Sequence, residues 1–316
     1  MNKYLPKIIF IILYCNLSFA EQLLNQDVDI SSGSTLSNDS GLTVRELSGG
    51  PYTIDNRGTI EATNITSNSN PNIRLEVGTS FDNSGLIDTS GSANLNSILF
   101  IDNSGTNSLI NSGTIQTETT GRYGQAINVE NASLTEITNS SGGTIKVTDS
   151  SLNSGAIRIT TGASVNTITN NETITATGTT HSRGIISINT GTIDRIDNTG
   201  TIQAQGGSNS NYGIVFWNNS GTTVTNSGTI QGTGGNYSYG IRLGNNGSIT
   251  KITNTGTIKG GKDGISNSGN ITNIVNTGTI TGTSGYGIHT GDGSITNLYF
   301  QIILNRNYNF FFQSIE

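Results

Sequence analysis

The sequence predicts an all-β fold, a single-stranded parallel β-helix (a solenoid) of about nine coils. Three observations predict it: a short phrase recurs at a nearly constant step, each repeat holds three short apolar pieces, and small polar residues separate those pieces. The chain has 42 Gly but only 32% hydrophobic and 11% charged residues. Disordered chains also have a low apolar content, but they are rich in Pro and charge, and this chain has three Pro.

The first 20 residues are typical of a secretory signal. Two lysines precede an apolar stretch at 8–17, which is too short to span a bilayer as a stable helix, and the segment ends in small residues. We expect cleavage between Ala20 and Glu21 and export of the mature chain to the periplasm, the cell surface or the medium.

Two alternatives remain for this segment. It could stay uncleaved as an anchor, or a lipid on the thiol of Cys15 could attach the chain to the outer membrane. The large side chain of Tyr14 disfavours lipidation, because a lipidation motif has a small residue immediately before the Cys.

Residues 21–50 lack the repeated phrase, and we expect them to cap the exposed first strand edge of the solenoid. Residues 51–298 carry the phrase Asn-(Ser/Thr)-Gly-Thr-Ile or a variant of it. Its closing isoleucines stand at 60, 87, 115, 145, 174, 202, 230, 258 and 280. Nine copies at one step predict nine stacked coils.

Each period contains three apolar pieces of three to six residues, exemplified by 228–230, 239–243 and 249–254. Such pieces, rich in Ile, Val and Thr and bounded by turn formers, predict strands. Because equivalent residues of successive coils stack about 4.8 Å apart, we expect Ile60 through Ile280 to form an inward ladder. We expect Asn56 through Asn276 to form a second ladder at a turn, with amides hydrogen-bonded from coil to coil.

The repeat breaks off after residue 298. Residues 299–316 contain no Gly and no Thr but are rich in aromatic residues, including Phe310, Phe311 and Phe312. We expect an aberrant tail, the product of a frame change or an abortive end; the alternative is an apolar cap over the last coil.

The pattern resembles the passenger domains of Gram-negative type V autotransporters. The resemblance is carried by the signal segment, the tandem phrase and the Tyr-Gly-Ile pieces at 212–214 and 239–241, and it covers about residues 50–298. It implies a right-handed β-helix that serves adhesion or virulence and reaches the cell surface through a C-terminal outer-membrane β-barrel. The alternating strands of a barrel are missing after residue 298, so we expect a passenger truncated before its barrel.

The function that we expect is adhesion or surface display without catalysis, with no cofactor and no metal. The partner would be a host-cell or matrix receptor, protein or glycan. A net charge of −6 without a basic run argues against nucleic acid, and the expected mature chain has no membrane span. The alternatives are a polysaccharide-acting enzyme on the same scaffold, or a remnant without function.

Few residues suggest chemistry. His181 and His289 fall in different coils, and we expect a loop position for the first and an outward strand position for the second. Asp194 and Asp197 flank Arg195, which predicts a solvated ion pair. We expect Asp263 and Asp292 to lie in Gly-rich loops.

The most suggestive surface feature is aromatic. Four tyrosines precede the Gly of the second apolar piece, and strand alternation places Trp217 and Val215 outward. Aromatic rings there could hold a sugar ring or a partner protein, or could simply pack as a ladder at the turn. The candidate surface residues are Trp217, Tyr212, Tyr239 and Tyr286, with Tyr123 at a similar position.

Overall fold

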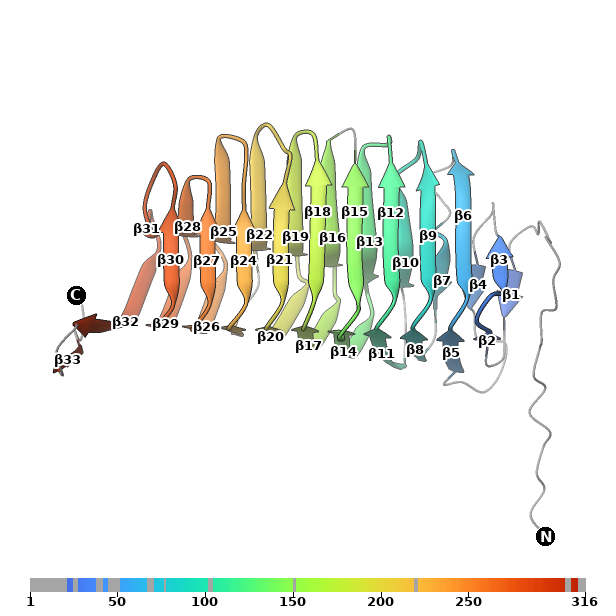
Figure 1. Ribbon diagram of the computed structural model, residues 1–316, viewed down its shortest axis with the longest axis horizontal. Coiled ribbons are helices and arrows are strands. Elements are labelled where there is room, and N and C mark those ends of the chain that lie inside the picture. Colours follow the sequence, from blue (N-terminus) through green and yellow to red (C-terminus); the bar gives the residue numbers. More distant parts are fainter. Residues whose placement is uncertain are drawn as a thin grey trace, which may run out of the picture.

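The computed structural model describes residues 22–24, 28–37, 42–44, 52–66, 71–76, 78–101, 105–149, 152–218, 221–304 and 308–311. All regular secondary structure in these residues is β-strand. The strands build a parallel β-solenoid of about nine turns, elongated along one axis (Figure 1), as the sequence predicts.

Three sheets run the length of the solenoid, and the chain visits them in a fixed order. Apart from β33, which pairs with β32, the strands of each sheet follow one another at intervals of three in chain order, so every coil adds one strand to each sheet. Within each sheet these pairings are parallel.

Sheet A is formed by the second apolar piece of each repeat. Its strands are β1 (Gln22–Leu24), β4 (Leu42–Val44), β7 (Ile73–Leu75), β10 (Leu95–Ile101), β13 (Tyr123–Glu130), β16 (Asn153–Thr160), β19 (His181–Ser187), β22 (Ser210–Phe216), β25 (Tyr237–Leu243), β28 (Asp263–Asn267) and β31 (Ile288–Thr290).

Sheet B is formed by the third piece. Its strands are β2 (Val28–Ile30), β5 (Tyr52–Asn56), β8 (Thr79–Asn83), β11 (Thr106–Asn111), β14 (Ser133–Asn139), β17 (Ser164–Asn170), β20 (Thr192–Asn198), β23 (Thr222–Asn226), β26 (Ser248–Asn254), β29 (Asn270–Asn276), β32 (Ser294–Leu304) and β33 (Tyr308–Phe311).

Sheet C is formed by the Gly-Thr-Ile piece and lies foremost in Figure 1. Its strands are β3 (Thr35–Ser37), β6 (Thr59–Ile65), β9 (Leu86–Gly91), β12 (Thr114–Thr119), β15 (Thr144–Asp149), β18 (Thr173–Gly178), β21 (Thr201–Gln205), β24 (Thr229–Gly232), β27 (Thr257–Gly260) and β30 (Thr279–Gly282).

The expected capping segment and the expected tail both contribute strands. Strands β1 to β4, within residues 21–50, pair in parallel with the next strands of the three sheets. At the other end β32 stays in register with β29 through Phe300, where Asn276 pairs with it, and then continues into an antiparallel pairing with β33. The regular pairing of the solenoid therefore extends two residues beyond the predicted boundary at 298.

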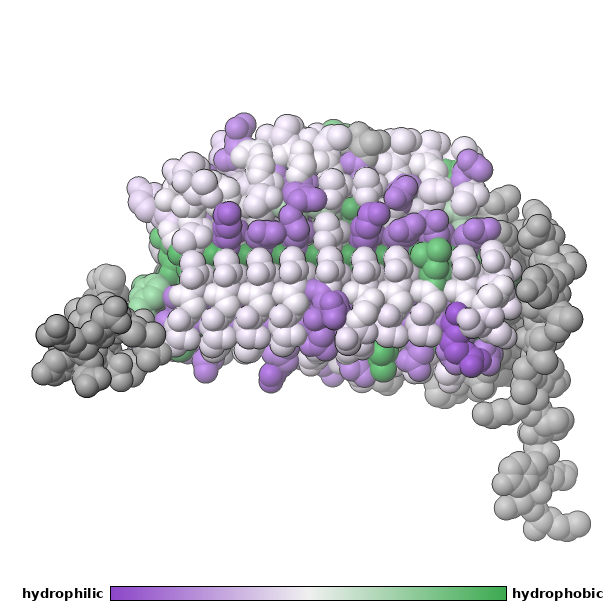
Figure 2. All heavy atoms as spheres, in the orientation of Figure 1, coloured by the Kyte–Doolittle hydropathy of each residue, from purple (hydrophilic) through white to green (hydrophobic). Residues whose placement is uncertain are grey.

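The core lies inside the coils and consists of aliphatic columns. The predicted isoleucine ladder is confirmed: Ile60 and its equivalents through Ile258 are fully buried, and Ile280 packs against the same cluster. Each of these isoleucines pairs with its equivalent in the next coil, for example Ile202 with Ile230 and Ile230 with Ile258. Figure 2 shows the same stacking from outside, since residues of similar hydropathy form rows along the long axis.

The predicted asparagine ladder is also confirmed. Each side-chain amide donates to the carbonyl oxygen of the equivalent Asn in the next coil, through eight bonds of 2.7 to 2.9 Å from Asn56 to Asn276. Asn198, which is 1% exposed, also donates to the backbone carbonyls of Gly200 and Thr229. The column therefore satisfies buried backbone groups at the turn between sheets B and C.

The Gly of the phrase is required by close stacking at the same turn. A Cβ on Gly228 would overlap the backbone carbonyl oxygen of Gly200 in the preceding coil. In one coil Glu172 takes the place of this Gly. The corresponding turn of the preceding coil is longer, and the hydrogen bond from Thr173 N to Gly143 O is 3.4 Å, against 2.8 Å for the equivalent hydrogen bond from Thr229 N to Gly200 O. A side chain is therefore found at this position of the turn where the two neighbouring coils lie farther apart.

Candidate functional site

The outer face of sheet A is uneven because one column of outward residues changes size along it. Residue for residue, the register aligns Gln125, Gly155, Arg183, Tyr212, Tyr239 and Asp263. A Cβ built on Gly155 would meet only Ile186 and Gln125, at 3.5 and 4.0 Å, which are ordinary contacts. The sheet is therefore hollowed at Gly155, between two larger side chains.

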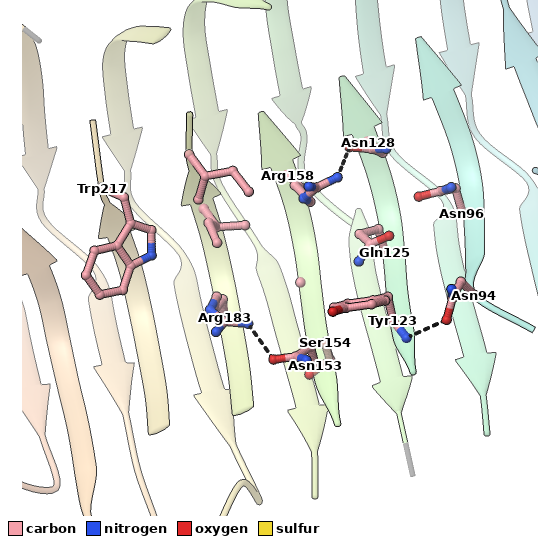
Figure 3. A pocket seen from close by; sticks show the side chains of 13 residues that line it. Asn94, Asn96, Tyr123, Gln125, Asn128, Asn153, Ser154, Arg158, Arg183 and Trp217 are labelled. Carbon is pink, nitrogen blue, oxygen red and sulfur yellow. Dashed lines mark hydrogen bonds between the residues drawn. The ribbon is translucent and has the colours of Figure 1, made fainter. Parts of the chain in front are cut away.

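A groove of about 510 Å³ occupies this hollow and extends across the neighbouring strands. It runs from β10 over β13, β16 and β19 to the end of β22 (Figure 3). Trp217 lies at one end, Tyr123 and the side chains of β10 lie at the other, and two arginines lie between them. The lining residues are Asn94, Asn96, Tyr123, Gln125, Asn128, Asn153, Ser154, Gly155, Arg158, Arg183, Ile186, Ile188 and Trp217.

The two arginines are held by amide side chains. Arg158 Nη1 donates to Asn128 Oδ1 at 3.4 Å, and Arg183 Nη1 donates to Asn153 Oδ1 at 3.3 Å (Figure 3). Arg183 Nε is buried and has no hydrogen-bond partner among the described residues. Burial lowers the pKa of Arg158, and burial together with the charge of Arg158 lowers the pKa of Arg183.

No acidic side chain balances these cations within the groove. Its lining contains neither Asp nor Glu, and in the described part of the chain no ion pair joins Arg158 or Arg183 to a carboxylate. The charge of Glu130, which is outside the lining, opposes the effect of burial on the pKa of Arg158, but burial is the larger cause, and no carboxylate acts in this way on Arg183. A partly buried guanidinium without a counter-charge is costly, because its desolvation is not offset by attraction. The groove is thus a cationic site on a protein of net charge −6.

An aromatic cluster adjoins the groove at the Trp217 end. Tyr212 and Tyr239 stack in parallel, with ring centroids 5.5 Å apart, and Trp217 meets Tyr212 edge to face at 6.4 Å. Val215 is outward, as predicted, but it is buried beneath these rings. The guanidinium of Arg242 lies 5.7 to 5.9 Å from the ring centroids of Tyr239 and Trp217.

Burial decides between the two interpretations of the predicted aromatic residues, and for two of them it supports packing. Tyr212 and Tyr239 are only 7% exposed, so they serve as packing under Trp217 and not as open contact surface. Trp217 is partly buried and lines the groove. Its ring lies so close to Gly244 that a Cβ there would overlap it at 2.5 Å.

The other two tyrosines lie apart from this cluster. Tyr286 is 65% exposed and stacks on His289 in the last coils of sheet A. Tyr123 is 39% exposed but belongs to a different column, because the register aligns it with Asn153, His181 and Tyr237. The sequence alignment on the Tyr-Gly pair was wrong for this coil.

The expectations for Asp263 and His181 were also wrong. Asp263 is not in an open loop: it begins β28, is 1% exposed, and its Oδ1 accepts a hydrogen bond from Tyr286 N at 2.8 Å. Its Oδ2 lies 3.7 Å from His289 Nδ1. His181 begins β19 and is not a loop residue, whereas His289 occupies the outward strand position predicted for it.

The other acidic residues that the sequence analysis named lie at the surface. Arg195 and Asp197 form an ion pair of 2.5 Å on sheet B, as predicted, and Asp194 and Asp292 are exposed. In the described ranges no three His, Cys, Asp or Glu side chains gather as metal ligands. Cys15, Ala20 and Glu21 lie outside the described residues.

The fold shows that the chain is a parallel β-solenoid, and comparison with known proteins identifies no relative of it. Compared with protein-family models, with curated proteins and with solved structures, the chain matches none of them. Within the described residues there is no helix long and apolar enough to cross a membrane. The family resemblance therefore depends on the sequence features given above and on the solenoid fold.

The sequence did not reveal the groove, because its residues come from five coils and most of them are small or polar. Arg158 and Arg183 do not share a column: Arg158 pairs with Ile186, and Arg183 pairs with Gly155. A search by strand register for outward cations near an outward Gly would have found them. A search for repeated motifs could not, because the site arises where the repeat is broken.

Proposed function

We propose that this protein is an exported, non-catalytic binding solenoid of the autotransporter-passenger type, with an adhesive role at the cell surface. The observation that carries the proposal is the groove on sheet A, where two cations without carboxylate partners lie between aromatic and amide side chains. Concave sites lined by aromatic groups and a few convergent polar groups are typical of ligand binding.

The scaffold suits this role because the groove lies on a continuous sheet. Its strands β10 to β22 are each paired on both sides, so the backbone under the groove is fixed before a ligand arrives. Pre-organisation of this kind reduces the entropy cost of binding. Export through residues 1–20 would place the groove outside the cytoplasm.

Adhesion is tested by filling the groove. The full chain, produced with its signal and purified after export, is applied to host-cell layers and to immobilised matrix proteins and glycans. Gly155→Leu adds a side chain at the hollow, and Gly291→Leu is the matched control, since Gly291 is exposed and a Cβ there meets only backbone and hydroxyl oxygens at 3.7 Å.

We expect wild type and Gly291→Leu to bind equally and Gly155→Leu to lose at least tenfold in affinity. Equal binding by all three chains would place the contact surface elsewhere, and no binding by wild type would refute the adhesive role. N-terminal sequencing of the exported chain tests cleavage before Glu21, and labelling with a radioactive fatty acid tests lipid on Cys15.

A polysaccharide-degrading enzyme on the same scaffold is the second candidate, and the buried Arg183 Nε, which has no hydrogen-bond partner among the described residues, favours it. A guanidinium with free donors in a groove could stabilise the negative charge that develops on a uronate during cleavage. Release of reducing ends from uronate polymers by wild type, and its loss in Arg183→Lys, would support catalysis over binding.

A further inference from the structure

The groove on sheet A carries an inference about the class of ligand, which rests on the proposed binding function. We propose that it binds a segment of anionic polysaccharide lying across the strands, with acidic groups at Arg158 and Arg183 and a sugar ring against Trp217.

The sign of the ligand follows from the unbalanced cations. A guanidinium has five N–H donors, and the described residues supply Arg183 with one acceptor, Asn153 Oδ1. Arg158 likewise has only Asn128 Oδ1, at 3.4 Å. A carboxylate or sulfate in the groove would supply both acceptors and counter-charge, and arginine recognises such groups with paired hydrogen bonds.

The saccharide character follows from the rest of the lining. Amide side chains both donate and accept hydrogen bonds, which suits hydroxyl groups, and they line the groove from β10 to β16, on the side of the arginines away from Trp217. Aromatic rings at its two ends offer flat apolar faces beside polar groups. A purely anionic ligand would not need such a mixture.

A peptide ligand is disfavoured by the position of the groove. Extended peptides commonly bind by adding a strand to a free sheet edge. Strands β10 to β22 have neighbours on both sides, so no edge is free under the groove. A ligand here must be recognised by side chains alone.

The length of the groove suits a short polymer segment. It spans five neighbouring strands of sheet A, and at about 4.8 Å per strand this is about 19 Å along the solenoid axis. The two arginines come from adjacent strands, β16 and β19, and are offset by three residues, about 10 Å, along the strand direction. They would therefore meet two acidic groups of a segment that crosses the strands diagonally.

The test uses the intrinsic fluorescence of the chain, because Trp217 is the single tryptophan. The full exported chain is titrated with tetragalacturonate, which bears carboxylates, and with a heparin tetrasaccharide, which bears sulfates as well. Fully methyl-esterified tetragalacturonate is the neutral control. Tetraglutamate and a short single-stranded oligodeoxythymidylate test the peptide and nucleic-acid alternatives. Calorimetry repeats every titration, so that binding without a fluorescence change is still detected.

We expect at least one acidic tetrasaccharide to bind at least tenfold more tightly than the ester, the peptide or the oligonucleotide. The better of the two identifies the acidic group. Arg183→Gln and Arg158→Gln should each weaken binding about 10- to 100-fold, as loss of a hydrogen-bonded charge pair implies. Arg195→Gln, an exposed arginine on sheet B, should leave it unchanged.

Gly244→Ala gives an independent readout, because the added methyl must displace the Trp217 ring. It should shift the emission maximum and weaken saccharide binding while both arginines remain. Circular dichroism of each variant identifies any that fail to fold, and for those Arg183→Lys and Arg158→Lys, which keep the charge but not the paired geometry, replace the Gln variants.

Equal binding of acid and ester, or equal binding of tetraglutamate, would overturn the proposal. If Gly155→Leu abolishes adhesion but neither tetrasaccharide binds, the groove is a binding site for another ligand class. If wild type shows no adhesion while a tetrasaccharide binds through the arginines, the adhesive role fails and the ligand class stands.

Discussion

The asparagine ladder gives a sharp test of the fold, because a single substitution can replace one of its hydrogen-bond donors by an acceptor. Asn198→Asp keeps the shape of the side chain but replaces the amide donor by an oxygen. Asn198 Nδ2 donates to Asn226 Oδ1 at 2.7 Å, Gly200 O at 3.0 Å and Thr229 O at 3.1 Å. The new oxygen would face three acceptors in a site that is 1% exposed.

The cost depends on pH. A protonated carboxyl retains one donor, so at low pH the variant loses about 1–3 kcal/mol for unsatisfied buried acceptors. The ionised form adds the penalty of an unpaired buried charge, several kcal/mol more, because among the described residues only Asn170 Nδ2 donates to this side chain. Burial and the facing acceptors raise the folded-state pKa of the introduced carboxyl above its unfolded value of about 3.9.

The sign follows from this raised pKa. Below about pH 3.9 the carboxyl is protonated in both states, and only the lost hydrogen bonds count. As pH rises through the folded-state pKa, folding must either retain a proton or bury a charge, and the variant loses stability relative to wild type. At pH 7 the loss should be a large part of a typical stability of about 5–15 kcal/mol.

Urea melts followed by circular dichroism, at several pH values from 3.5 to 7.5, measure this difference. Asn245→Asp, in an exposed turn, is the control for the same chemical change and should melt within about 0.5 kcal/mol of wild type. If Asn198→Asp and Asn245→Asp melt alike at pH 7, the buried amide ladder is refuted.

Three further predictions concern other columns. Ile230→Asp places an unpaired charge in the fully buried ladder and should cost several kcal/mol in urea melts, whereas Thr233→Asp, in a partly exposed join, should cost little; equal losses would show that the assigned phase is wrong. Gly228→Ala forces backbone atoms of two coils apart and should cost about 3 kcal/mol or more, and a neutral result would contradict the close stacking at this turn. Burial, and then the charge of Arg183, lowers the pKa of His181, so the unfolded chain binds its proton more readily; stability should therefore fall as pH drops through about 6.5, and His181→Asn should reduce this loss in thermal melts at pH 5 and 7.5.

The fold was predictable from sequence because its determinants repeat. Ile230 and Asn226 each stand in a column of equivalents, and a column of nine residues gives a signal that no single residue gives. The same logic explains why the closing strand was misjudged at Phe300, which takes the place of the expected Asn: strand pairing continues through backbone hydrogen bonds when the side-chain pattern has already ended.

The site was not predictable by the same means. Gly155 is one of 42 glycines, and nothing in the repeat distinguishes it, whereas the register places it in an outward column where its missing side chain opens the groove. Tyr212 and Tyr239 were offered as surface, but their burial depends on Val215 and Trp217 packing with them, a contact between coils that alternation along one strand does not reveal.

The coils differ in length. Asn254 and Asn276 are only 22 residues apart, whereas Asn226 and Asn254 are 28 residues apart, yet the hydrogen bond between the side-chain amides is 2.7 Å long in both pairs. A coil could therefore be replaced by one of a different length, provided that the new coil keeps the Asn and Ile of the two columns. Insertion of one coil between β16 and β19 would move Arg158 and Arg183 apart by one further strand spacing, about 4.8 Å, without disturbing either ladder. For the proposed polysaccharide ligand, gain or loss of a repeat at this place would change the spacing of the acidic groups that the two arginines can bind.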